Sequence, residues 1–141
     1  MINSLPGIVV LEPPDEVVGS EINIPLPANF IYKLICLQFT FDTDGNAATR
    51  LPQLSLTDGT QEIFRLSLAP TQMLNSIVVR SIAPMGALIT AVDANRVNTP
   101  WPIDFLMKGT WEIDTVTTAI QVGDQYKDIT LTVQRWATQN P

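Results

Sequence analysis

Residues 39–66, FTFDTDGNAATRLPQLSLTDGTQEIFRL, contain the pattern that decides the fold. Leu54 and Leu56 alternate with polar residues before the pair Asp58-Gly59, and apolar residues alternate again after it. Such alternation is typical of half-buried β-strands. Asp-Gly provides the positive φ that a tight hairpin turn requires. The sequence therefore predicts a β-hairpin centred on this pair.

The same alternation continues on both sides of the hairpin. We expect further strands over residues 17–26, 31–41, 74–83, 87–94, 101–108, 109–117 and 126–136. In the strand over 31–41, one face should carry Ile35, Leu37, Phe39 and Phe41. In the strand over 126–136, one face should carry Ile129, Leu131 and Val133. No segment has the pattern of an amphipathic helix, and 11 prolines and 7 glycines suit loops between strands. The prediction is an all-β protein, an antiparallel β-sandwich that is jelly-roll-like.

The first 16 residues differ from the rest. Pro6, Pro13 and Pro14 disfavour helix and favour an extended chain. Between them lies an apolar run, Ile8, Val9, Val10 and Leu11, that needs a surface to cover it. Two placements are open: an edge strand of the chain's own domain, or an arm that lies on a neighbouring subunit. We divide the chain into an extended N-terminal arm, 1–16, and a single β domain, 17–141.

Composition limits the partners. The 141 residues are 45% hydrophobic, enough for one core, and carry a formal net charge of −6. The eight basic residues are scattered, which argues against binding to nucleic acid or an anionic membrane. The N-terminus lacks the basic start of a signal peptide, so we expect no secretion. The single cysteine, Cys36, allows no intrachain disulfide and is expected to be a small buried apolar residue.

The residue types exclude most catalytic chemistry. With no histidine and one cysteine, the chain has no Ser-His-Asp or Cys-His catalytic set and no ordinary zinc site. Carboxylate-only hydrolysis is the remaining possibility, with Asp42, Asp44, Asp104 and Asp114 as candidates by residue type alone. We expect no enzyme, no catalytic residue, no metal and no cofactor.

Residues 42–46, DTDGN, are the best candidate for a cation site. Asp42, Asp44 and Asn46 alternate as calcium ligands do, but Ala47 stands where an EF-hand needs glycine and Gln53 where it needs glutamate. An EF-hand is therefore excluded. Two interpretations remain: a calcium site completed by a second loop, or a turn between strands. If the stretch is a turn between strands, Arg50 is expected near Asp42 or Asp44.

Two stretches of the β region, one internal and one at its end, together resemble a known class of protein. Residues 39–66, quoted above, and residues 106–136, LMKGTWEIDTVTTAIQVGDQYKDITLTVQRW, are similar to small jelly-roll structural proteins of tailed bacteriophages, a resemblance that covers residues 17–136. It implies a capsid cement (decoration) protein, often a homotrimer, on the virion surface. The implied partner is the major capsid protein, and assembly would take place in the cytoplasm of the host bacterium.

Two roles are compatible with this resemblance. A cement protein bridges neighbouring capsid subunits and stabilises the head; the contact residues we expect are Ile8, Val9, Val10, Leu11, Met73, Leu74 and Met85. The alternative is a receptor- or glycan-binding module of a head fibre or tail tip, in which Trp101 and Trp136 would stack on sugars. Core or interface packing is the other interpretation of these tryptophans and of Trp111.

Overall fold

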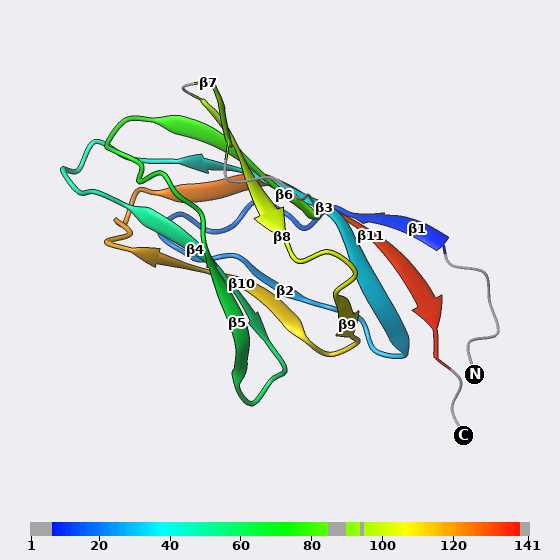
Figure 1. The fold of residues 1–141 in the computed structure, drawn as a ribbon. Coiled ribbons are helices and arrows are strands. Elements are labelled where there is room, and N and C mark those ends of the chain that lie inside the picture. Colours follow the sequence, from blue (N-terminus) through cyan, green and yellow to red (C-terminus); the bar gives the residue numbers. More distant parts are fainter. Residues whose placement is uncertain (1–6, 85–89, 94, 139–141) are drawn as a thin grey trace.

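The structure is a computed structural model that describes residues 7–84, 90–93 and 95–138. The described residues form strands and no helix. Among them, accordingly, no helix is long and apolar enough to cross a membrane. The strands are β1 (Gly7–Leu11), β2 (Asn23–Pro25), β3 (Phe30–Asp42), β4 (Leu51–Thr57), β5 (Glu62–Ser67), β6 (Ile77–Pro84), β7 (Thr90–Asp93), β8 (Arg96–Trp101), β9 (Leu106–Lys108), β10 (Glu112–Thr118) and β11 (Gln125–Ala137) (Figure 1).

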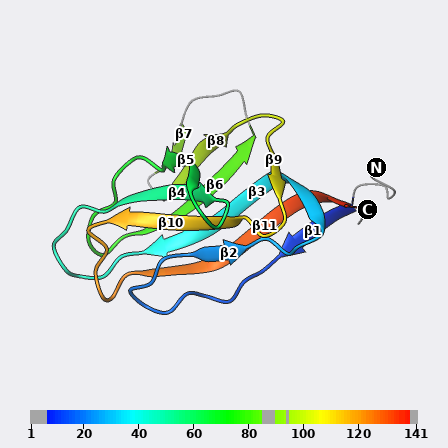
Figure 2. The same ribbon diagram turned by 90° about the horizontal axis from the view of Figure 1, so that it is seen from below.

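The strands form two sheets that lie against each other (Figure 2). The large sheet has the order β1-β11-β3-β6-β8-β7, with β9 also paired to β3, and the small sheet has the order β2-β10-β4-β5. The predicted all-β sandwich is confirmed. One described pair, β6 with β8, is parallel, in contrast to the antiparallel pairing of the other strands. The jelly-roll order of connections stays a prediction.

The inner faces of the two sheets meet in one apolar core. Ile129, Leu131 and Val133 of β11 are buried there, as the alternation predicts. The ring of Tyr126 stacks on Phe41 with their centroids 4.3 Å apart. Burying one large apolar side chain stabilises the fold by about 1.5–3 kcal/mol, so these alternating positions hold the sheets together.

Strand β3 corrects one prediction about the core. Leu37 and Phe39 are buried as expected, but Ile35 is 38% exposed instead of sharing their face. In the pairing with β11, Leu34 lies opposite Val133 and the next partnered residue is Cys36, so Ile35 is an extra residue. Such a β-bulge reverses which residues point inward, and upstream of it the buried residues of β3 are Tyr32 and Leu34.

The apolar run near the N-terminus forms strand β1 on the edge of the large sheet. Residues 7–11 pair antiparallel with residues 131–135 of β11 without a register shift. The chain beyond β1 stays on the same domain, because Asp15 accepts a hydrogen bond from the Asp128 backbone at 2.9 Å. Of the two placements considered for the predicted arm, the structure has the edge strand, at least over the residues it describes.

Other strand boundaries also differ from the predictions. The hairpin is confirmed, with φ of +92° at Gly59 between β4 and β5. The strand expected over 17–26 is only β2, because the chain turns at residues 17–20 and Gly19 has a φ of +85°. The strand expected over 101–108 is divided between β8 and β9.

Candidate functional site

Four segments meet at one end of the sandwich, which we call the loop end: residues 16–20, 42–50, 72–76 and 119–124. Figure 1 shows that the connections β3–β4, β5–β6 and β10–β11 all lie at this end. Backbone hydrogen bonds join the segments, from Asn75 N to Asp44 O at 2.8 Å and from Gly19 N to Asp124 O. The stretch 42–46 that is the candidate cation site therefore lies in the middle of this end.

A buried ion pair occupies the centre of the loop end. The Arg50 guanidinium donates from Nε to Asp124 Oδ2 at 3.0 Å and from Nη2 to Asp44 Oδ1 at 2.8 Å. Nη1 donates to the carbonyl of Ala48. The side chains of Arg50 and Asp124 are both fully buried. This arrangement confirms the expected Arg50–Asp44 contact, while Asp42 pairs instead with Lys127 at 2.9 Å.

Asp44 is held as a carboxylate by several donors. The backbone N–H groups of Asn46 and Gly123 donate to it at 2.9 Å, and the Asn46 side-chain amide donates at 2.8 Å. Burial alone would raise the pKa of Asp44, but the hydrogen bonds from Asn46 and Gly123, together with Arg50, hold that pKa below its ordinary value. Asp44 is thus a structural acceptor that joins two loops.

The candidate calcium site at residues 42–46 has an arginine side chain between its carboxylates. The second loop that a calcium site would need is present, because Asp124 stands beside Asp44. The positive charge between these two carboxylates is the guanidinium of Arg50. No group of three or more potential metal ligands occurs among the described residues. Glycine is needed at 123, since a Cβ there would lie 2.5 Å from Asp44 Oδ2.

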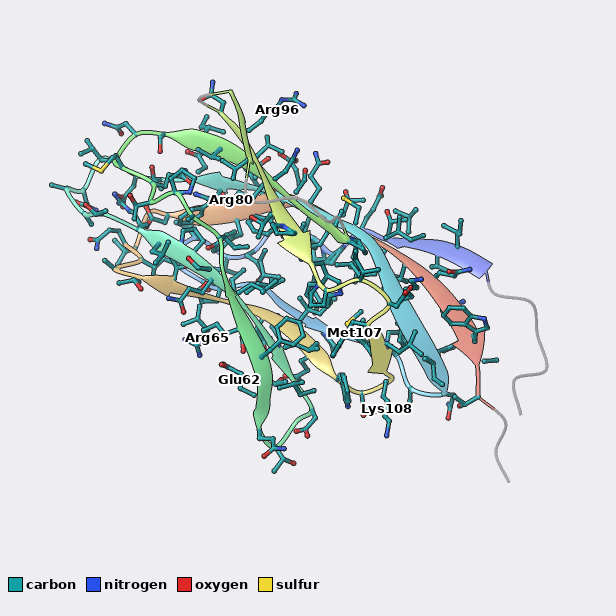
Figure 3. The ribbon with its side chains drawn as sticks, in the orientation of Figure 1. Glu62, Arg65, Arg80, Arg96, Met107 and Lys108 are labelled. Carbon is teal, nitrogen blue, oxygen red and sulfur yellow. The ribbon has the colours of Figure 1, made fainter. Side chains whose placement is uncertain are left out.

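Segment 72–76 is tied to the same framework. Arg50 and Gln72 exchange backbone hydrogen bonds of 2.9 and 2.7 Å, and the Thr43 hydroxyl donates to the carbonyl of Met73 at 2.6 Å. Arg80 of β6, labelled in Figure 3, is buried, and its Nη2 donates to the carbonyl of Pro70, two residues before this segment, at 2.9 Å. Burial lowers the pKa of Arg80 to about 10. The backbone that carries Met73 is therefore fixed from both sides.

The loop end exposes apolar side chains over this rigid base. Their exposed fractions range from 37% to 84%, and the residues are Val17, Val18, Met73, Leu74 and Val122. Met73 and Leu74 are exposed as predicted, and Met85 lies outside the described residues. The sequence predictions do not include the three valines; Val17 and Val18 fall within the strand expected over 17–26. The Gly-Asp pair 123–124 was the sequence signal for a turn that places Val122 at the surface.

The candidate carboxylates of a hydrolase lie in separate places. Asp42 and Asp44 are engaged as described above, and Asp104 pairs with Lys33 at 2.8 Å. Asp114 lies on β10, where burial raises its pKa and Asn23 donates a hydrogen bond to it. The structure does not bring these four aspartates together.

Trp101 and Trp111 pack in or against the core, whereas Trp136 and Cys36 are half-buried. Trp101 is 2% exposed, with Phe64 and Phe105 against it at centroid distances of 5.0 and 6.1 Å, so its faces are not open to a sugar. Trp111 and Trp136 are half-buried. Cys36 is half-buried rather than buried, and burial raises the pKa of its thiol, which makes the thiolate less available.

Comparisons with protein-family models, with curated proteins and with solved structures give no match to this chain.

Proposed function

We propose that this chain is a structural virion protein of the capsid cement type, which binds the outer capsid surface through its loop end. The observation that carries the proposal is the group of exposed apolar side chains Val17, Val18, Met73, Leu74 and Val122, gathered at one end of the sandwich. Exposed apolar groups that are concentrated in one place are typical of protein contact surfaces. The capsid as partner, and the virion surface as location, come from the resemblance to phage jelly-roll proteins.

The buried framework suits a docking surface. Arg50 links the 42–50 loop to the 119–124 loop, and Gln72 links it to the 72–76 segment. Loops that are already ordered lose little conformational entropy when they bind, so more of the contact energy is available for affinity. A cement protein that contacts two or more capsid subunits at once also raises the free energy needed to separate them.

The same framework supports a role without catalysis. Three carboxylates of the loop end and its border, Asp42, Asp44 and Asp124, are each paired with a basic side chain. A general acid or base must be able to reach a substrate proton, and these groups are already engaged. The alternative of a glycan-binding module has less support, because Trp101 is buried.

The test is the occupancy of capsids that lack this chain, purified from the phage whose genome carries its gene. The variant Val17→Lys/Val122→Lys places two charges in the loop end, where both valines are at least 75% exposed, so the fold should be retained. We expect occupancy to fall by about tenfold or more, since burying an unpaired lysine is costly.

The matched control is Val116→Lys, an exposed valine on β10. It makes the same chemical change away from the loop end and should decorate capsids like the unaltered chain. Full occupancy by the loop-end variant would overturn the proposed docking surface. Absence of binding by the unaltered chain would overturn the cement function.

A further inference from the structure

Over the described residues the strand orders of the two sheets end in four strands, β1 and β7 in the large sheet and β2 and β5 in the small one, and three of these are protected against further pairing. Strand β2 is three residues long and ends in Pro25. Strand β5 carries the ion pair Glu62–Arg65 with an N···O distance of 2.6 Å (Figure 3). Strand β7 is four residues long and its register shifts before Asp93. Short length, charge, proline and irregular register are the usual means of preventing edge-to-edge association.

Strand β1 is the exception. Its residues Gly7–Leu11 contain no charge and no proline, and their register with β11 is continuous. Among the described strands β1 pairs with β11 alone, so its other edge carries backbone donors and acceptors without a strand partner. Ile8 and Val10 are 69% and 52% exposed. An apolar, regular edge of this kind is a template for another strand.

The surroundings of β1 favour an uncharged partner strand. Ile8 and Val10 point to the same face, because side chains alternate along a strand. Their neighbours across the pairing with β11 are Gln134 and Thr132, which carry no charge. Val9 points the other way and packs against the core. Arg135 is the one charged residue opposite β1; it faces Gly7, and its guanidinium lies 4.1 Å from the centroid of the Phe30 ring. Over Ile8–Leu11 a strand added beside β1 would thus meet apolar or neutral groups.

We propose that β1 pairs antiparallel with β1 of a second copy of this chain, about a twofold axis at Val9. In this register Ile8 of each copy faces Val10 of the other, so the exposed apolar residues cover one another. Gly7 faces Leu11, and a Cβ at Gly7 would meet nothing within 4 Å, so the backbone there is open to approach. The large sheets of both copies become one continuous sheet.

The twofold register keeps like charges apart. The nearest acidic residue of the chain is Glu12, directly after β1. In the twofold register the two Glu12 residues lie at opposite ends of the paired strands, so like charges do not face each other. A strand that pairs with itself through the same surface is the ordinary geometry of a C2 dimer. One five-residue edge is a small contact, so we expect a dimer that forms in a concentration-dependent manner.

This inference does not rest on the capsid function. It concerns β1, which in Figures 1 and 2 lies at the end of the sandwich away from the loop end. It replaces the threefold assembly that the resemblance implies with a twofold contact between copies.

The test is sedimentation equilibrium of the full chain across a series of concentrations. We expect a monomer–dimer equilibrium for the unaltered chain. Ile8→Lys/Val10→Lys should raise the dissociation constant by about tenfold or more, because lysines from the two copies would face each other. Mixing this variant with Ile8→Glu/Val10→Glu should restore a dimer, since each lysine then faces a glutamate.

Val17→Lys/Val122→Lys is the control and should dimerise like the unaltered chain. A second measurement needs no variant: amide hydrogen exchange of residues 8–11 should slow as the concentration rises. The inference is overturned by a monomer at all concentrations, by a trimer, by a dimer that the β1 lysines leave unchanged, or by failure of the mixed charges to restore pairing. None of these outcomes bears on capsid occupancy, which tests the proposed function separately.

Discussion

At the scale of single residues, Arg50 does what a bound cation would do. It stands between Asp44 and Asp124, two carboxylates from separate loops, and is itself fully buried. Buried carboxylates need a positive partner, because an uncompensated charge in the protein interior is costly. The alternation of acidic residues in DTDGN therefore serves the closure of two loops around an arginine.

We predict that Arg50→Ala destabilises the protein by about 3–5 kcal/mol, because it leaves Asp124 buried without a counter-charge. Urea unfolding followed by tryptophan fluorescence measures the free energy. The control is Arg65→Ala, which removes an arginine from an ion pair on the surface of β5 and should cost much less, since exposed ion pairs contribute little. Equal losses for the two variants would contradict a structural role of the buried pair.

Of the two carboxylates that pair with Arg50, only Asp44 could be predicted from the sequence. Asp44 is six residues from Arg50, close enough for a turn to bring the two side chains together. Asp124 is 74 residues away, and its position depends on how β11 pairs with β3. A single sequence contains no record of that pairing, so the second partner became visible only in the folded chain.

At the scale of elements, predictions from local patterns were confirmed where the signal was local. The turn at Asp58-Gly59 is set by its own residues, and Asp58 accepts hydrogen bonds from the N–H groups of Thr60 and Gln61 at 2.8 Å. The bulge at Ile35 depends on the partner strand, and the alternation of β3 gives no sign of it. The strand expected over 17–26 failed because the turn at Gly19 interrupts it.

Strand β1 allows an element-scale test of its placement on the chain's own sheet. We predict that Val9→Ala destabilises the monomer by about 1 kcal/mol, because Val9 packs against the core. Ile8→Ala is the matched control, since Ile8 is exposed, and should have a much smaller effect. Both unfolding curves are to be measured at low concentration, where a neighbouring copy contributes nothing.

The two placements of residues 8–11 give opposite results in that experiment. If the run lay on a neighbouring subunit instead of on β11, dilution would remove its contacts and Val9→Ala would leave the monomer unchanged. Burial against β11 requires the loss to persist on dilution.

At the scale of the whole molecule, the apolar loop end stands out against an acidic chain. The net charge is −6, yet the buried charges at the loop end compensate one another, as Arg50 does with Asp44 and Asp124. The surface proposed to meet the capsid thus exposes apolar side chains beside neutral ones such as Asn46 and Asn75, over a buried ion pair that is compensated. Attraction between apolar surfaces does not depend on long-range fields, which salt screens within about 8–10 Å at moderate ionic strength.

We therefore predict that capsid binding depends little on salt. Raising sodium chloride from low to high concentration should leave the occupancy of decorated capsids unchanged within about twofold, while an interface built on ion pairs would lose affinity and association rate. Sodium sulfate, which strengthens apolar association, should increase it. Val17→Lys/Val122→Lys provides the internal comparison: any binding that remains through its new charges should weaken as salt rises. A steep fall in occupancy of the unaltered chain with sodium chloride would show that charged groups outside the loop end carry the contact.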